Sequence, residues 1–165
     1  MLKASSVAWK KLKITVSETE NILYRNSFEI EGGNFNKAGI VSTSIKSLLK
    51  QMGLAAEVVR KCAIVCYESE INVVSYARKG VVNLSVNAET VLIEVVDEGP
   101  GIPNIDQAMQ QGYSTADQKI REMGFGAGMG LHNIKSYSDE FNISSEVGKG
   151  ARLLMTVNIS NADKK

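Results

Sequence analysis

Residues 97–102 read DEGPGI and follow the apolar run at residues 91–96, which predicts a β-strand that ends at a carboxylate. A second glycine-rich stretch, residues 124–131, reads GFGAGMGL and leads into a run with helical character as far as Tyr137. Glycine permits backbone conformations and close approaches that a Cβ forbids. A helix N-terminus offers free N–H groups and the positive end of a dipole to phosphate. The two stretches, in this order, indicate a nucleotide site.

Two common nucleotide motifs do not fit these glycines. The dinucleotide fingerprint needs glycines at positions one, three and six, but Met129 or Leu131 stands at the sixth position. The phosphate-binding loop needs Gly-Lys followed by Ser or Thr, whereas the Gly-Lys at residues 148–149 is followed by Gly150. Turn glycines and a flexible loop would explain either stretch alone, but they are a poor account of both in this order.

A third feature is the predicted helix over residues 58–77, whose apolar and small side chains recur every three or four residues. Glu68 and Asn72 are four apart and lie on adjacent turns of one face, with a rise of about 6 Å between them. Such a pair can hold a hydroxyl and a hydrated Mg²⁺ side by side, since Mg²⁺ favours oxygen ligands completed by phosphates. An ordinary surface pair is the alternative, but the apolar neighbours of Asn72 disfavour plain solvent around this face.

Together the motifs resemble the GHKL superfamily of ATPases and kinases, which share the Bergerat nucleotide fold. Residues 68–72 look like the family's N box, and residues 97–101, 126–131 and 148–150 look like its three glycine boxes. The resemblance covers roughly residues 35–159. Four ordered motifs with suitable gaps make it more specific than any single glycine run.

The resemblance implies ATP and Mg²⁺ as cofactors. In that scheme Asp97 accepts a hydrogen bond from the adenine amino group, Asn72 ligates Mg²⁺, and Glu68 orients or deprotonates a hydroxyl of the protein substrate. Ser114 and Thr115 belong to a lid over residues 113–123. The implied nucleotide-binding residues are Asn72, Asp97, Gly99, Gly101, Ile102, Gly126, Ala127, Gly128, Met129, Gly130 and Leu131.

Within the superfamily, the chain is most similar to the bacterial anti-sigma-factor serine/threonine kinases and switch kinases. It is short, and residues 109–115 and 138–150 look like the lid and the tail of that group. There are departures: Tyr76-Ala77 replaces the His-Gly of many members, and Ala151 stands where the third glycine box has a threonine that helps hold a water near adenine.

The resemblance predicts an ATP-dependent serine/threonine kinase that phosphorylates an antagonist-type (STAS-like) partner, with a sigma factor or phosphatase as a further partner. The alternative is a nucleotide-sensing module that docks such a partner without transferring phosphate. An ATPase fragment of a topoisomerase or repair protein is disfavoured because no transducer domain accompanies the motifs. The oligomeric state stays open, a homodimer included.

Composition limits the remaining classes. The net charge of +1 argues against a nucleic-acid partner. Neither a transmembrane run nor a signal peptide is present, which predicts a cytoplasmic protein with no membrane partner. Cys62 and Cys66 are expected to be reduced, buried thiols because a zinc site would need two further ligands.

The predicted fold is an α+β, two-layer sandwich with a mixed, mostly antiparallel sheet and helices on one face. Strands are expected at residues 26–31, 81–87, 91–97, 141–147 and 152–159, and helices at 36–52, 58–77, 106–111 and 131–137. Residues 1–165 are expected to form one domain, with 1–20 an uncertain extension and 161–165 disordered.

Overall fold

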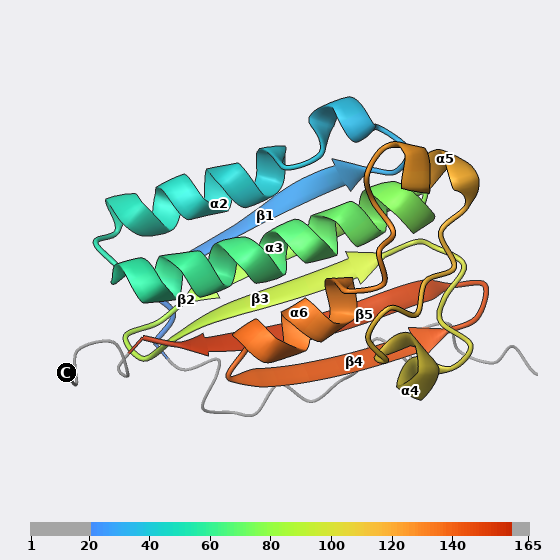
Figure 1. Ribbon diagram of the computed structural model, residues 1–165. Coiled ribbons are helices and arrows are strands. Elements are labelled where there is room, and N and C mark those ends of the chain that lie inside the picture. The colour runs from blue at the N-terminus through green and yellow to red at the C-terminus, as the bar shows by residue number, and fades with distance from the viewer. Residues whose placement is uncertain (1–20, 160–165) are drawn as a thin grey trace, which may run out of the picture.

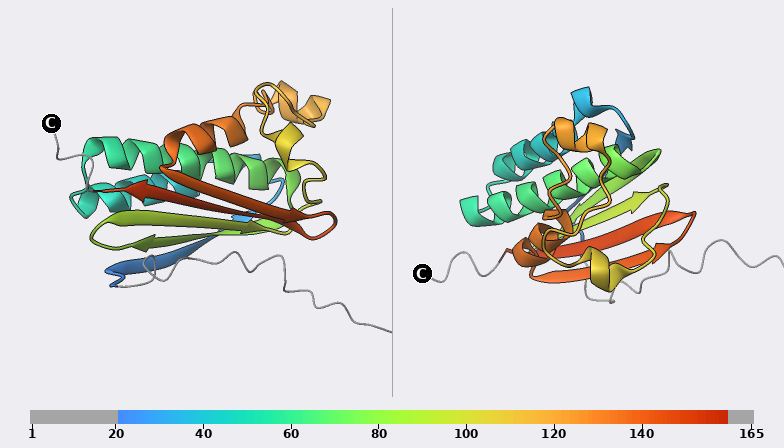
Figure 2. Two further views of the ribbon diagram at one scale, coloured as in Figure 1. Left: turned by 90° about the horizontal axis from the view of Figure 1, so that it is seen from below. Right: turned by 45° about the vertical axis from the view of Figure 1, so that its right-hand side comes forward.

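The computed structural model describes residues 21–159, so the predictions for residues 1–20 and 161–165 lie outside the described residues. One sheet carries a layer of helices on one of its faces (Figures 1 and 2), and the predicted α+β sandwich is confirmed. The elements in chain order are β1 (Tyr24–Glu31), η1 (Phe35–Lys37), α2 (Ile40–Gln51), α3 (Ala56–Tyr76), β2 (Lys79–Val86), β3 (Thr90–Asp97), α4 (Ile105–Ala108), α5 (Gln118–Glu122), α6 (Gly130–Tyr137), β4 (Glu140–Glu146) and β5 (Gly150–Asn158).

The five described strands are ordered β1-β2-β3-β5-β4. All four pairings are antiparallel, so the parallel component of the mixed sheet that we expected is not found among these strands. β2 alternates between buried and half-buried side chains, as expected for a strand with one covered face. Asn87 closes the β2–β3 turn, where its Oδ1 accepts hydrogen bonds from the backbone N–H groups of Glu89 and Thr90. This register brings Asp97 to the end of β3 beside Gly80 of β2.

α3 is the central helix of the layer and packs between α2 and α6 (Figure 1). Its inner face joins the core through side chains that include Val58, Val65 and Val73, each at most 2% exposed. Cys62 and Cys66 are free and buried on the same face, as predicted. Burial raises the pKa of Cys62 to about 12 and raises that of Cys66, so both thiols stay protonated.

The single helix that we expected over residues 36–52 is interrupted. Gly39 adopts a left-handed conformation, with φ 91°, between η1 and α2. The cause lies on α3: the buried carboxylate of Glu70 accepts hydrogen bonds from the first free N–H groups of α2, at Val41 (3.0 Å) and Ser42 (2.9 Å). A carboxylate at a helix N-terminus satisfies free donors and complements the helix dipole, so α2 begins where Glu70 can reach it.

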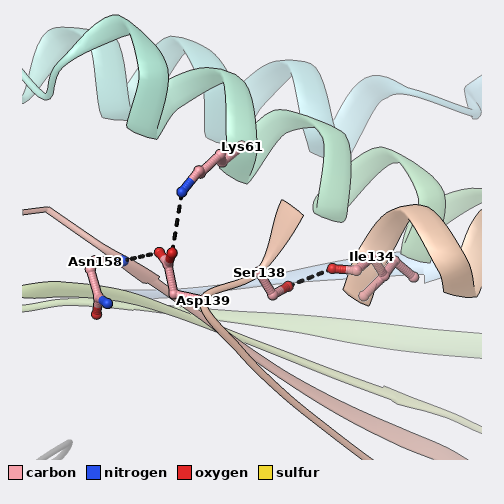
Figure 3. A network of polar contacts seen from close by, with 5 residues as sticks. All are labelled: Lys61, Ile134, Ser138, Asp139 and Asn158. Atoms are coloured by element: carbon pink, nitrogen blue, oxygen red, sulfur yellow. Dashed lines mark hydrogen bonds and ion pairs between the residues drawn. The ribbon is translucent and has the colours of Figure 1, made fainter. Parts of the chain in front are cut away.

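The end of the sheet remote from the glycine-rich loops is joined to the helices by a polar network (Figure 3). Asp139 accepts a hydrogen bond from Lys61 of α3 (3.2 Å) and another from the backbone N–H of Asn158, the last residue of β5 (2.8 Å). Ser138 closes α6 by donating its hydroxyl to the carbonyl of Ile134 (2.7 Å). Through Asp139, the segment that follows α6 is held against both α3 and the end of β5.

In residues 21–159, no helix has both the length and the apolar character that crossing a membrane requires.

Candidate functional site

A cavity of about 440 Å³ is lined by residues of α3, β3, α4 and the loops between β3 and α6. α4 and α5 lie at the same end of the molecule (Figure 1). The volume of the cavity lies in the range of small-molecule sites. α3 forms one wall with Glu68, Asn72 and Ser75, and Asp97 of β3 lies in its floor. The loops between β3 and α6 complete it. The cavity therefore brings together residues of the N box and of the first two glycine boxes, whereas residues 148–150 of the third do not line it.

Asp97 is held from one side only. Its Oδ1 accepts hydrogen bonds from the backbone N–H groups of Gly99 (2.8 Å) and Ala151 (3.2 Å). Burial raises the pKa of the carboxyl, and these two hydrogen bonds oppose the rise. No hydrogen bond from the described part of the chain reaches Oδ2, so that oxygen is left to accept a donor from a ligand.

The loop after β3 passes very close to the β4–β5 hairpin. A Cβ on Gly101 would lie 2.3 Å from the carbonyl oxygen of Glu146, and its φ of +75° also favours glycine. The next residue, Ile102, donates its N–H to the hydroxyl of Ser145 (2.7 Å). The two contacts hold this loop along the rim of the cavity.

Glu68 and Asn72 meet the start of α6. A Cβ built on Gly130 would lie 3.3 Å from Asn72 Oδ1 and 3.4 Å from Glu68 Oε2, so a side chain there would crowd both groups. The other oxygen of the carboxylate, Oε1, accepts a hydrogen bond from Nδ2 of Asn133, one turn into α6 (2.7 Å). The carboxylate is thereby oriented, with Oε2 directed toward the glycines.

The lid segment over residues 113–123 contains a helix that the sequence did not predict. Asp117 caps α5 by accepting the N–H of Ile120 (2.9 Å), and the Ile120 side chain is buried. The stacked rings of Phe125 and Phe35, 5.6 Å apart, join the glycine-rich stretch just after this segment to η1. Ile120 is the one buried residue of α5. A single apolar position gives no repeated spacing, so the sequence pattern did not predict a helix here.

Residues 59–161 match the family described as "Histidine kinase-, DNA gyrase B-, and HSP90-like ATPase". The match spans more than half of the chain. The chain belongs to this ATPase family.

Individual relatives of the ATPase domain are regulators and kinases by name. The chain is 33% identical over 101 residues to an anti-sigma F factor of Thermoanaerobacter sp. (strain X514), covering 61% of this chain and 63% of the relative. It is 29% identical over 112 residues to the serine/threonine-protein kinase RsbT of Bacillus subtilis (strain 168), covering 66% and 78%. An anti-sigma F factor of Clostridium kluyveri is 26% identical over 139 residues, covering 81% and 94%. The chain thus spans just under two thirds of the length of the first of these relatives.

Most of the predicted site residues line the cavity of this ATPase domain. They are Glu68, Asn72, Asp97, Gly101, Ile102, Ser114, Thr115, Gly126, Ala127, Gly128, Met129, Gly130 and Leu131. Gly99 does not: it lies behind Asp97, where a Cβ would meet Asp97 Oδ1 at 2.9 Å and Ala77 at 3.2 Å. Gly99 therefore supports the carboxylate and is not part of the cavity wall.

Membership of an ATPase family implies that the chain binds ATP, and the cavity suits such a ligand. Ser75 Oγ is buried in the cavity wall and has no hydrogen-bond partner among residues 21–159. A buried hydroxyl without a partner costs free energy, so a polar ligand here would satisfy it. Ser75 was not among the site residues predicted from the sequence, although its spacing from Asn72 (i, i+3) could have indicated it.

Proposed function

We propose that this chain is an ATP-dependent serine/threonine protein kinase and anti-sigma regulatory factor that phosphorylates an antagonist-type protein. The observation that carries the proposal is the position of Glu68: an oriented carboxylate beside Asn72, at the glycine-rich start of α6. A carboxylate so held can act as a general base toward a hydroxyl. The names of the relatives, anti-sigma F factor and serine/threonine-protein kinase, support the same function.

The proposal gives separate roles to Asp97, to the glycines of residues 126–130 and to Glu68. Asp97 Oδ2 accepts a hydrogen bond from the adenine amino group, and the N–H groups around Gly126, Gly128 and Gly130 donate to the phosphates. When bound, ATP would supply the γ-phosphoryl group and leave as ADP. Glu68 then orients the acceptor hydroxyl and takes up its proton. Phosphoryl transfer depends mainly on such positioning and electrostatics.

Asn72 is the proposed protein ligand of Mg²⁺. Mg²⁺ usually keeps several waters and is held by one or two protein oxygens together with substrate phosphates. The described residues contain no cluster of three or more His, Cys, Asp or Glu side chains that could hold a metal by themselves. The Asn72 side-chain oxygen, beside the start of α6 where the phosphates are proposed to bind, fits this mode of Mg²⁺ binding.

A second candidate is a nucleotide-sensing module that docks a sigma factor or phosphatase and transfers no phosphate. Ala151 favours it: this buried methyl group borders the cavity beside Asp97, at the position where the third glycine box that the sequence resembles implies a threonine hydroxyl. The absence of one polar group near adenine would weaken nucleotide binding, but it leaves Glu68, the proposed base, in place. We therefore rank this candidate second.

Incubation of the full chain with γ-labelled ATP, Mg²⁺ and an antagonist-type protein tests the choice. We expect label on a serine or threonine of that protein. Nucleotide binding without label on any antagonist-type protein would refute the kinase and leave the binding module.

A further inference from the structure

A second hollow lies between α2 and α3, the two helices that run side by side across the sheet (Figure 1). It is a groove of about 340 Å³. Ala56, Ala63 and Ile64 of α3 give it an apolar floor, together with the buried Val59. The remaining lining residues are Lys46, Lys50, Arg60, Tyr67 and Glu68.

Three cations line this groove. Lys46 and Lys50 are four apart on α2 and share one face of that helix. Arg60 of α3 also lines the groove, but its guanidinium lies 5.9 Å from the centre of the Tyr137 ring of α6, on the side of α3 away from α2. The three side chains are exposed, and none forms an ion pair with another described residue. Lys46 and Lys50 therefore offer positive charge along α2, and Glu68 is the one carboxylate among the described residues that line the groove.

The groove and the nucleotide cavity meet on α3. Tyr67 and Glu68 line both hollows, and Tyr67 is 42% exposed. From Ala56 to Glu68 the helix rises about 18 Å, the span of about five extended residues or about three helical turns. A segment lying along the groove would thus reach Glu68 from the side of α2, while the nucleotide occupies the other side.

We propose that this groove docks an acidic segment of the protein substrate and brings its acceptor hydroxyl to Glu68. The inference rests on the proposed kinase function, to which it adds the chemistry of substrate recognition. Apolar side chains of the segment pack on the floor, and its carboxylates face Lys46 and Lys50. Charge complementarity of this kind gives orientation and partner choice more than raw affinity, which suits a substrate that must leave after transfer.

The test uses two fluorescein-labelled twelve-residue peptides with the full chain. The acidic peptide alternates Asp or Glu with apolar residues and ends in serine, and the basic peptide carries lysine at every acidic position. Binding is measured by fluorescence anisotropy, and phosphorylation of each peptide is measured with γ-labelled ATP. The variants are Lys50→Glu, the double variant Lys46→Glu with Lys50→Glu, and the matched control Lys135→Glu.

The control is matched because Lys50 and Lys135 are both exposed lysines in the last turn of a helix. Replacing either lysine by glutamate therefore removes a similar favourable interaction with the helix dipole. Lys135 lines neither hollow. We expect the acidic peptide to bind the wild type and the Lys135→Glu variant alike, and the double variant roughly tenfold more weakly. The affinity should also fall with added salt.

Three results would overturn the docking groove: no preference for the acidic peptide, unchanged affinity in the double variant, or equal weakening by Lys135→Glu. An oligonucleotide that competes for the groove with higher affinity than the peptide would also overturn it, in favour of a nucleic-acid surface. Binding that depends on the two lysines without label transfer supports the groove and counts against the kinase, so the two proposals fail separately.

Discussion

Substitution of Asp97 by Asn separates nucleotide recognition from folding. The variant's Oδ1 can still accept the N–H groups of Gly99 and Ala151, the two bonds that hold the native carboxylate. Its Nδ2 then replaces Oδ2, so a donor faces the adenine amino group, which is itself a donor. Loss of a charge-assisted hydrogen bond costs about 1.5–3 kcal/mol, which predicts that ATP and ADP bind about 10-fold to 150-fold more weakly.

The fold should not suffer from this change. Burial raises the pKa of Asp97 in the folded chain, so the folded state holds the proton more tightly than the unfolded state. Such a group lowers the free energy of unfolding as the pH rises above the ordinary carboxyl pKa near 4. Asn carries no charge, so at neutral pH the variant without nucleotide should unfold at the same temperature as the wild type or higher.

Calorimetric titration and thermal unfolding measure the two effects. Equal nucleotide affinity in the variant would refute the assignment of Asp97 to the base. Weaker binding accompanied by a marked fall in unfolding temperature would show instead that Asp97 is structural.

Three further substitutions or conditions test other parts of the site. Asn72→Ala should weaken binding of Mg²⁺·ATP much more than binding of metal-free ADP, because the amide is proposed to touch the metal and not the base; equal weakening in calorimetry would make Asn72 structural. Asn133→Ala should lower phosphoryl transfer by roughly tenfold with little change in ATP affinity, because the bond that orients Glu68 is lost; an unchanged rate would remove that role. Residues 113–123 should exchange amide hydrogens quickly without nucleotide and slowly with a non-hydrolysable ATP analogue; identical protection in both states counts against a lid.

Much of the fold could be predicted from local patterns. The apolar spacing of α3 and the strand–turn–strand pattern of β2 and β3 both depend on neighbours within a few residues, and both elements were found within about two residues of their predicted bounds. The interruption before α2 was not predictable in this way. It depends on the hydrogen bonds from Val41 and Ser42 to Glu70, which is about 30 residues away in the sequence.

In the site, too, the local motifs could be predicted from the sequence and the contacts between distant residues could not. Ordered motifs predicted Glu68, Asn72, Asp97 and the glycines of residues 126–130 as site residues, and all of them line the cavity. The N box contains two glutamates, and only the structure shows that Glu70 caps α2 while Glu68 faces the cavity. Asn133 was not predicted as a site residue because it contacts Glu68 across 65 residues of sequence, from a different helix.

The central claim is that Glu68 serves phosphoryl transfer and not nucleotide binding. Glu68→Gln keeps the shape of the side chain and its acceptor oxygen for Asn133 but removes its basicity. We predict that the variant binds ATP with nearly unchanged affinity and transfers γ-labelled phosphate to an antagonist-type protein about 10²-fold more slowly, or slower still. Equal transfer rates in the variant and the wild type would contradict the account, because the base would then have to lie elsewhere.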